Sequence, residues 1–239
     1  MSSFSQEPIV KLKDVSIFQE GTPVLKNISF EIGKGEFVYL IGRTGSGKSS
    51  LLKTLYADLL PENGEIEVAG YNLRTIKNSK VPFLRRKVGI VFQDFQLLFD
   101  RSIAENLIFV MKATGWKDKA KIKGRLTEVL MGVGLDSAAN KLPHQLSGGE
   151  QQRIVIARAL INEPTIMLAD EPTGNLDPEV ADEILLLFQE INRNGTAVMM
   201  ATHNHSFLNK YPARVLKTEQ GKVLDSSKEL FSFSLRHDY

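Results

Sequence analysis

Cysteine is absent from the 239 residues of this chain. Disulfide bonds and thiolate metal sites are therefore excluded, and the composition suits a reducing cytoplasm. No apolar run approaches the roughly 18–20 residues that a membrane-spanning helix needs. The first residues also lack the basic and apolar segments of a signal peptide. If the protein works at a membrane, we expect another chain to supply the spans.

An excess of charge is also missing. The formal net charge is +2 at pH 7, so the overall charge gives no reason to expect a nucleic-acid partner. Hydrophobic residues make up 42% of the chain and charged residues 24%, which is typical of a globular protein with an ample core. The length allows one large domain or two small ones.

The most informative stretch is glycine-rich. Residues 42–49, GRTGSGKS, fit the pattern G-x-x-x-x-G-K-[ST] without a mismatch. They lie between a predicted buried strand at 37–41 and a predicted helix at 50–59. Such a loop directs backbone N–H groups and the positive end of a helix dipole toward a phosphate. Lys48 would reach the β- and γ-phosphates, and the Ser49 hydroxyl would bind Mg²⁺. A glycine turn that binds nothing is the alternative, and the agreement of loop and flanks favours a nucleoside triphosphate site.

Two adjacent carboxylates, Asp170 and Glu171, follow the predicted buried strand at 165–170. An apolar strand that ends in an aspartate is the usual Mg²⁺-side element of a phosphate-loop NTPase. Glu171 would point to the other side of the strand end and polarise a water. The alternative is a pair of solvated loop acids, which would be the better interpretation if the phosphate loop were missing.

A helix is predicted to begin at Ser147 and to reach about Ile161. Ser147 and Glu150 have the spacing of a capping box, which is a complete structural reason for both. Gly148 and Gly149 are not explained by it, because adjacent glycines weaken the first turn of a helix. They predict a close approach to the backbone, such as a phosphate at the positive end of the helix.

The remaining pattern predicts strands and helices around these motifs. Antiparallel strands are expected over 9–17 and 28–32, with further strands at 65–69, 88–92 and 197–201 and a closing hairpin at 214–216 and 222–224. Helices are expected at 102–111, around 126–133 and at 178–191. Residues from about 95 to 160 thus form a mainly helical insert within a β-rich core.

Three segments have two interpretations each. The loop at 94–101 carries Phe95, Leu97, Leu98 and Phe99, which need a cover from this chain or from a partner. The basic segment 112–125 around the single tryptophan would bind nucleic acid or lipid headgroups, or it is a solvated helical face. The stretch 203–205, His-Asn-His, suggests a metal, but no third ligand lies nearby in the sequence.

Taken together, these stretches resemble the ABC ATPase family across residues 9 to about 225. The resemblance rests on motifs in the family's order: the phosphate loop, Gln93, the segment 146–150, the strand at 166–171, the turn 175–177 and His203. It implies an α/β fold in which a RecA-like phosphate-loop NTPase core carries an antiparallel β subdomain and an inserted helical subdomain. The core would be about 1–94 and 162–225 and the helical subdomain about 95–161, all one domain, followed by a tail at 226–239 of unknown role.

The resemblance also implies roles for individual residues. Adenine would stack on Phe18, and Asp177 would couple two sites across a dimer. Catalytic roles fall to Glu171 as general base, His203 as a contact to the γ-phosphate, and Gln93 as a sensor of Mg²⁺ and of the attacking water. The ligands of Mg²⁺ would be Ser49, Gln93 and Asp170. The ATP phosphates would be held by Gly42, Arg43, Thr44, Gly45, Ser46, Gly47, Lys48, Ser49 and Ser50. The γ-phosphate bound by a second copy would be met by Ser147, Gly148, Gly149 and Glu150.

The implied function is ATP hydrolysis by a head-to-tail homodimer with Mg²⁺. An integral membrane subunit would dock at the Gln93 loop and the helical subdomain and hold the protein at the cytoplasmic face of the plasma membrane. Within the family, residues 81–86, 92–94, 97–101 and 168–177 are most similar to ATPases of bacterial cell division, which transmit force across the membrane to control peptidoglycan hydrolysis. Other proteins of the division apparatus are further candidate partners. Lipoprotein-release and macrolide-export ATPases share much of the last stretch, and a nucleotide-dependent scaffold with little turnover is a third interpretation.

The sequence departs from the family pattern at several positions. Phe18 stands where tyrosine is commoner, which the stacking role tolerates because only the aromatic face is used. Asn204 stands where aspartate is usual, so the charge near His203 differs. Tyr211 and Pro212 replace an acidic-basic pair, and the tail after Asp225, with Phe231, Phe233 and Leu235, has no family counterpart.

Overall fold

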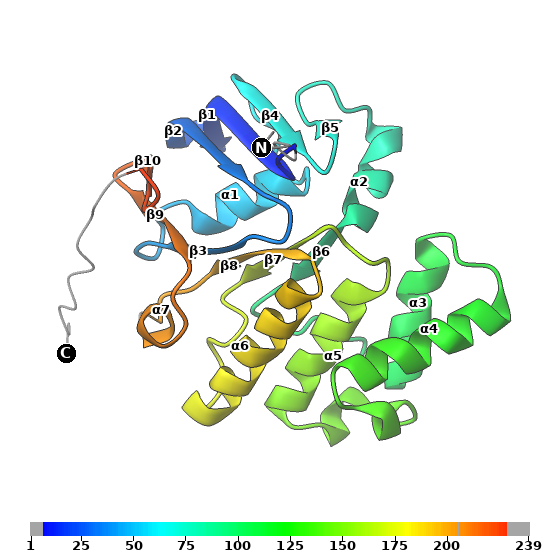
Figure 1. Cartoon of the computed structure of the whole chain (residues 1–239). Helices are drawn as coiled ribbons and strands as arrows, with labels where there is room; N and C mark the ends of the chain where they lie inside the picture. Colours follow the sequence, from blue (N-terminus) through cyan, green and yellow to red (C-terminus); the bar gives the residue numbers. More distant parts are fainter. Residues whose placement is uncertain (1–6, 205, 229–239) are drawn as a thin grey trace, which may run out of the picture.

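Two β-sheets form the frame of the protein, whose computed structural model describes residues 7–204 and 206–228 (Figure 1). The first is antiparallel with the order β2-β1-β4-β5. Its strands are β1 (Val10–Gln19), β2 (Thr22–Ile32), β4 (Glu65–Val68) and β5 (Tyr71–Asn72). The second sheet has the order β10-β9-β3-β8-β7-β6. Its strands are β3 (Phe37–Ile41), β6 (Val88–Val91), β7 (Ile166–Asp170), β8 (Ala197–Ala201), β9 (Arg214–Glu219) and β10 (Lys222–Asp225).

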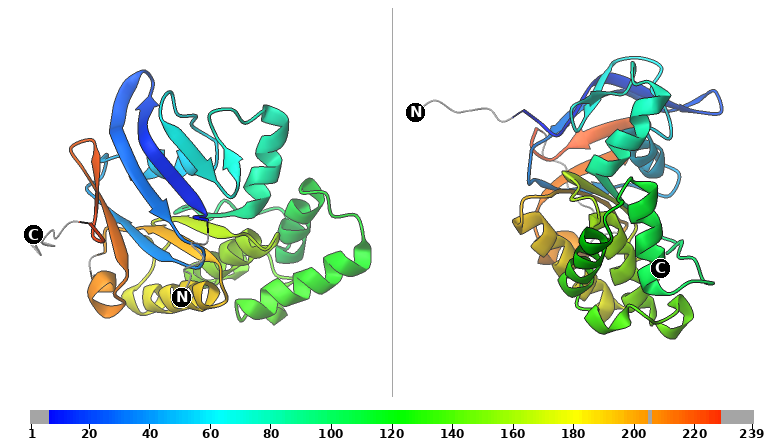
Figure 2. Two further views of the ribbon diagram at one scale, coloured as in Figure 1. Left: turned by 45° about the horizontal axis from the view of Figure 1, so that its top comes forward. Right: turned by 90° about the vertical axis from the view of Figure 1, so that its right-hand side faces the viewer.

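The helices are distributed unequally over the second sheet. One helix, α1 (Lys48–Leu55), lies between the two sheets, and most of the others lie on the opposite face (Figure 1). The remaining α-helices are α2 (Val81–Lys87), α3 (Ile103–Ala113), α4 (Lys119–Gly132), α5 (Gly148–Leu160), α6 (Pro178–Arg193) and α7 (Ser206–Lys210). Short 3₁₀ turns are η1 (Asn78–Lys80), η2 (Asp136–Ala138) and η3 (Pro143–Gln145). Helices α3 and α4 lie at the side of the molecule away from β9 and β10 (Figures 1 and 2).

Alternation along the buried parallel strands divides the core in two. In β3, Val38 and Leu40 belong to the cluster that also contains α1 and the antiparallel sheet. Tyr39 and Ile41 belong to the cluster formed with α3 to α6. Side chains of successive strand residues point to opposite faces, so a strand covered on both sides is apolar throughout. This explains why the strands at 37–41, 166–170 and 197–201 were recognisable as short continuous apolar runs.

The fold class and most of the predicted elements are confirmed, with corrections at some ends. The helix predicted at 50–59 begins at Lys48 and ends at Leu55, because Ala57 adopts a left-handed conformation with φ 57° and turns the chain. Helix α2 was not predicted; only Leu84 is buried in it, so it has no hydrophobic period to detect. The closing hairpin is confirmed as β9 and β10, and β9 also extends the main sheet parallel to β3.

Three further expectations concern the limits of the helical subdomain, the membrane spans and the C-terminal tail. Helix α5 packs against β6, so the helical segment shares its core with the sheet, and the predicted limits of the helical subdomain stay a prediction. None of the helices in the described part of the chain has the length and apolar character needed to cross a bilayer. His205, Phe231, Phe233, Leu235 and the rest of the tail from 229 lie outside the described residues.

Candidate active site

The strand order brings three loops together at one edge of the main sheet. Strand β8 lies between β3 and β7, with Leu40 beside Ala201 and Ala201 beside Asp170. All three strands are parallel, so the phosphate loop after β3, His203 after β8 and Glu171 after β7 leave the sheet at the same edge. Ligands of open α/β sheets bind at the carboxyl ends of the strands.

The lysine of the phosphate loop forms hydrogen bonds with the backbone of the same loop. The Lys48 ammonium is buried and donates hydrogen bonds to the carbonyls of Gly42, at 2.8 Å, and Arg43, at 3.4 Å. Gly47 precedes helix α1 with φ 101°, and a Cβ on it would lie 2.8 Å from Cγ1 of Val24 in β2. Glycine is therefore required there by both conformation and space. The structure thus gathers the predicted phosphate-binding residues around the start of α1.

Thr218, a residue that the sequence did not single out, supports this loop from β9. Its hydroxyl lies 2.6 Å from that of Ser46, and it donates to the carbonyl of Ile41 at 3.1 Å. A Cβ on Gly42 would lie only 2.2 Å from the Thr218 Oγ1 atom. No sequence signal could have found Thr218, because its role depends on β9 lying beside β3.

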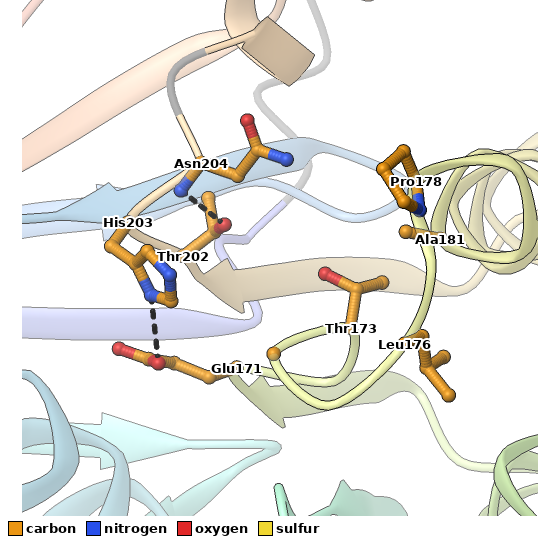
Figure 3. A pocket seen from close by; sticks show the side chains of 9 residues that line it. Glu171, Thr173, Leu176, Pro178, Ala181, Thr202, His203 and Asn204 are labelled. Carbon is orange, nitrogen blue, oxygen red and sulfur yellow. Dashed lines mark hydrogen bonds and ion pairs between the residues drawn. The ribbon is translucent and has the colours of Figure 1, made fainter. Parts of the chain in front are cut away.

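Glu171 is held between two other predicted site residues. Its Oε1 lies 3.7 Å from the Lys48 ammonium, and its Oε2 lies 2.9 Å from Nδ1 of His203. Figure 3 shows the His203 ring directed at this carboxylate from the β8 loop. The Glu171 backbone has φ 48° and is fixed by its N–H bond to the Ala201 carbonyl at 3.0 Å. Left-handed backbone at a non-glycine residue is strained, and such strain is concentrated at functional sites.

Asp170 and Ser49 offer oxygen ligands of the kind that Mg²⁺ prefers. Burial raises the pKa of the Asp170 carboxyl, and the hydrogen bond from the Ser49 hydroxyl opposes this. The negative charge of Glu171 also raises this pKa, whereas Lys48 and Lys53 lower it. Among the described residues no group of three or more acidic or histidine side chains could hold a metal alone. The pair fits Mg²⁺, which usually takes one or two protein oxygens and completes its shell with phosphate and water.

Gln93 and Phe18 lie at the edges of this arrangement. Gln93 is exposed after β6 and lies against Gly174, whose added Cβ would be 3.3 Å from the Gln93 Nε2 atom. Phe18 is half-buried near the end of β1. The next residue, Gln19, accepts a hydrogen bond of 3.2 Å from the Ser50 hydroxyl in α1, which ties this end of β1 to the phosphate loop. Their roles toward Mg²⁺ and adenine stay predictions.

The segment that begins α5 gains a structural explanation. The capping box is present, with the Glu150 carboxylate accepting from the Ser147 N–H at 2.7 Å, and this hydrogen bond lowers the pKa of Glu150. A Cβ on Gly149 would lie 2.4 Å from Cγ1 of Val180 in α6, and one on Gly148 would lie 3.4 Å from Leu176. Packing therefore requires the glycine at 149, apart from any phosphate. Contact with a second copy's ATP stays a prediction for 147–150.

Asp177 occupies the N-cap position of α6 without making a capping hydrogen bond, and its side chain is exposed. Aspartate at this position usually accepts a bond from the first turn. The side chain is thus available for another partner, which is compatible with the predicted coupling role.

The apolar loop at 94–101 is half covered by its own chain. Leu97 is buried in the core and Phe95 packs against it, whereas Leu98 and Phe99 are 37% and 59% exposed. The buried Asn106 side chain fixes the loop by accepting from the Leu98 N–H at 2.7 Å and donating to its carbonyl at 3.0 Å. The exposed pair therefore lies on a well-ordered surface.

The basic segment 112–125 is not one helical face. It spans the end of α3, a connection through Trp116 and the first half of α4. Arg125 is turned inward, where it donates to the carbonyls of Leu160 and Ile161. The other basic side chains of the segment are exposed.

Comparison with known proteins matches residues 25–174, more than half of the chain, to the ABC transporter family model. The chain is 44% identical to the cell division ATP-binding protein FtsE of Streptococcus pneumoniae serotype 2 over 227 residues, which is 94% of this chain and 98% of that protein. It is 43% identical to the FtsE of Bacillus subtilis over 217 residues, 90% of this chain and 95% of that protein.

A solved structure of an ATP-binding cassette is similar to this protein over nearly the whole chain. The dimeric post-hydrolysis state of the ATP-binding cassette MJ0796, bound to ADP and Pi, superposes with a TM-score of 0.78 at 34% identity. The superposition covers 93% of this chain and 100% of that one.

Proposed function

The chain belongs to the ABC transporter family of ATPases, and from this membership we propose that it is the ATP-hydrolysing subunit of an FtsE–FtsX-type membrane complex in bacterial cell division. The complex would transmit an ATP-driven change of shape across the membrane to control peptidoglycan hydrolysis. The subunit would lie at the cytoplasmic face of the plasma membrane, held there by its FtsX-like partner. The identity of 44% to the cell division protein FtsE, over 94% of this chain and 98% of that protein, supports the role in cell division.

The observation that carries the hydrolytic function is the position of Glu171 between Lys48 and His203. A carboxylate at the end of β7, beside the lysine of a phosphate loop, is placed to accept a proton from a water that attacks the γ-phosphate. His203 would orient this carboxylate and reach the γ-phosphate with its other ring nitrogen. A scaffold without turnover has no need for such an arrangement.

Binding of ATP would use the phosphate loop from Gly42 to Ser50 and the face of Phe18. Ser49, Asp170 and Gln93 would hold Mg²⁺, which would neutralise charge that develops on the phosphates. The Ser147–Glu150 segment would meet the γ-phosphate of the ATP that a second copy binds, so that each site would be completed across two copies. The similar cassette MJ0796 is described as dimeric in a state bound to ADP and Pi, which supports a dimer here.

The test compares ATP hydrolysis by the wild type and Glu171→Gln, alone and with the purified membrane subunit, together with mass by light scattering. Loss of the general base should lower turnover by a factor of roughly 10²–10⁴ and leave ATP binding intact. The variant should accumulate as an ATP-bound dimer. Glu190→Gln, an exposed change at the far end of α6, is the matched control. Equal turnover in the wild type and Glu171→Gln would overturn the assignment.

A further inference from the structure

Strand β9 contacts the phosphate loop from outside, through the side chain of Thr218. The main sheet places β9 between β10 and β3, and Thr218 lies opposite Val223 of β10 (Figure 1). Thr218 is only 1% exposed. The residue before it, Lys217, lies beside Ile41, the last residue of β3. Because strands hold Thr218 on both sides, its hydroxyl group has a fixed position beside the start of the loop.

The two hydroxyl groups at this contact have defined roles as donor and acceptor. The Thr218 hydroxyl has a single proton, which it donates to the carbonyl of Ile41 at 3.1 Å. In the contact of 2.6 Å with Ser46, Thr218 must therefore accept, and the Ser46 hydroxyl donates. This bond uses the only proton of the Ser46 side chain. The Ser46 oxygen is left with lone pairs, which do not bind the oxygens of a phosphate.

Hydrogen bonds hold each of the three consecutive carbonyls at 41–43, where the loop begins. The donors are the Thr218 hydroxyl to Ile41, the Lys48 ammonium to Gly42 at 2.8 Å, and the Ser46 N–H to Arg43 at 3.0 Å. The Lys48 ammonium is expected to turn to the phosphates when a nucleotide binds. Of these three donors, Thr218 alone lies outside the loop. Its hydrogen bond is therefore the one that ties the loop to the sheet whether or not a nucleotide is present.

The same two side chains pack against the first residue of the loop. Gly42 has φ 154°, and a Cβ on it would lie 2.5 Å from Oγ of Ser46 and 2.6 Å from the carbonyl oxygen of Thr218. These atoms occupy the space that a side chain would need. The start of the loop is thus held by close packing as well as by hydrogen bonds.

We infer that Thr218 is a positioning residue for nucleotide binding, which holds the phosphate loop in place through Ser46 and Ile41. The Ser46 hydroxyl serves this contact and does not donate to a phosphate. The inference rests on the proposed function, whose nucleotide site it refines. A preorganised loop loses less entropy when it binds, so the contact should raise affinity. It should affect the chemical step little, because Glu171 and His203 follow β7 and β8 rather than β9.

The first test removes the Thr218 hydroxyl and keeps the shape of the side chain. Thr218→Val should raise the Kd of ADP with Mg²⁺ roughly tenfold, as expected from the loss of one buried hydrogen-bonded contact. The KM for ATP should rise in proportion, whereas kcat should change by less than roughly twofold. Thr218→Ser retains the hydroxyl and should bind ADP nearly as tightly as the wild type. Isothermal titration calorimetry and steady-state hydrolysis check this. Equally weak binding by both variants would overturn the inference, because the hydroxyl would not be the cause.

Ser46→Ala separates the two roles that its hydroxyl could have. Alone, this change should raise the Kd of ADP by no more than Thr218→Val does. Added to Thr218→Val, it should have no further effect, because both substitutions remove the same contact. A further loss of affinity in the double variant would mean that the Ser46 hydroxyl donates to a phosphate, and it would overturn the inference.

Thr114→Val is the matched control for a general effect on folding. The Thr114 hydroxyl donates to the carbonyls of Val110 and Met111, at 2.9 and 3.1 Å, at the end of α3. Helix α3 lies on the side of the molecule away from β9 (Figures 1 and 2). This variant should bind ADP as the wild type does, and a Kd raised as much as in Thr218→Val would overturn the inference.

Two further outcomes distinguish the inference from the proposed function. An unchanged Kd in Thr218→Val, while the wild type binds ADP, would overturn the inference alone. Failure of the wild type to bind ADP or ATP would instead overturn the proposed function.

Discussion

The imidazole Nδ1 of His203 lies 2.9 Å from Oε2 of Glu171, although 32 residues separate them in the chain. The parallel pairing of β7 with β8 produces this contact, since Asp170 lies opposite Ala201 and both strands then end. The contact also orients the carboxylate. Its Oε2 atom faces the imidazole ring, and its Oε1 atom faces the Lys48 ammonium at 3.7 Å. His203 is therefore placed to set the orientation of the proposed general base.

We expect His203→Ala to lower kcat of ATP hydrolysis by roughly 100-fold, with KM for ATP little changed, because the base loses its orientation while the phosphate loop is intact. Steady-state hydrolysis and a separate measurement of ATP binding check this. The double variant with Glu171→Gln is the decisive comparison. Residues that act as a unit are not additive, so the double variant should be no slower than Glu171→Gln alone. A further 100-fold loss would show that His203 acts independently of Glu171.

The sequence predicted the parts of the site that local pattern determines. The phosphate loop, the strands at 37–41, 166–170 and 197–201 and the acids after β7 all follow from a short motif or a continuous apolar run. Their meeting at one sheet edge also followed, through the resemblance. Residues whose role depends on strand order were missed. Ser46 and Thr218 are 172 positions apart, and only the placement of β9 beside β3 joins them.

Packing between helices was also beyond the sequence. Gly148 and Gly149 were predicted to allow a close approach to the backbone, such as that of a phosphate, and this stays a prediction. The sequence could not show the second reason, which is that a Cβ on Gly149 would lie 2.4 Å from Cγ1 of Val180. The end of α1 was misjudged. Leu59 continues the helical period, but the left-handed Ala57 has already ended the helix. The spacing of apolar residues indicates which side chains are buried. It does not show where the helix ends, because a leucine in the following turn can also be buried.

Asp225 should make the protein sensitive to acid. Burial raises the pKa of this carboxyl, but hydrogen bonds from Arg214 and Ser227 outweigh it and lower the pKa to about 2. The pKa in the unfolded chain is higher, at about 3.9. A lowered folded pKa stabilises the protein fully above the unfolded value, and this stabilisation is lost as the pH falls from about 4 to about 2.

Accordingly, Asp225→Asn should lower the free energy of unfolding by roughly 2 kcal/mol at pH 7 and by much less at pH 2.5. Urea unfolding at both pH values measures the difference. Asp100→Asn is the control, because that carboxylate is exposed and its pair with Arg101 is 3.7 Å long. A loss that is equal at both pH values would contradict the role of this ion pair.

Asn106 should control the loop that carries the exposed Leu98 and Phe99. The Asn106 amide is buried, and besides its two bonds to Leu98 it donates to the carbonyls of Arg101 and Ser102. Asn106→Leu removes the partners of the Leu98 N–H and the Arg101 carbonyl, whereas the Ser102 carbonyl still accepts from the N–H of residue 106. We therefore expect a loss of roughly 1–3 kcal/mol in the free energy of unfolding. Limited proteolysis should then cut within 96–101. Asn140→Leu, an exposed change, should do neither. Resistance of the Asn106 variant to both measurements would show that the apolar packing of Leu97 is sufficient to hold the loop.

Gly149 has two proposed reasons to be glycine, and a pair of substitutions separates them. In Gly149→Ala the new methyl group meets Cγ1 of Val180 at 2.4 Å, so the free energy of unfolding should fall by roughly 1–3 kcal/mol. Adding Val180→Ala removes the opposing methyl group and should restore much of this loss. Gly124→Ala is the control for helix propensity, since it lies in α4 with nothing within 4 Å, and it should stabilise the protein by roughly 0.5–1 kcal/mol.

Hydrolysis by the double variant then decides the functional question. If the backbone at 149 must approach the γ-phosphate held by a second copy, the methyl group still obstructs it. Hydrolysis should then stay at least tenfold below the wild type although stability is restored, and Val180→Ala alone should retain activity. Light scattering with ATP, in the Glu171→Gln background, should show fewer dimers once Gly149→Ala is added. Full activity of the double variant would mean that Val180 alone requires the glycine and that the segment 147–150 does not complete the partner's site.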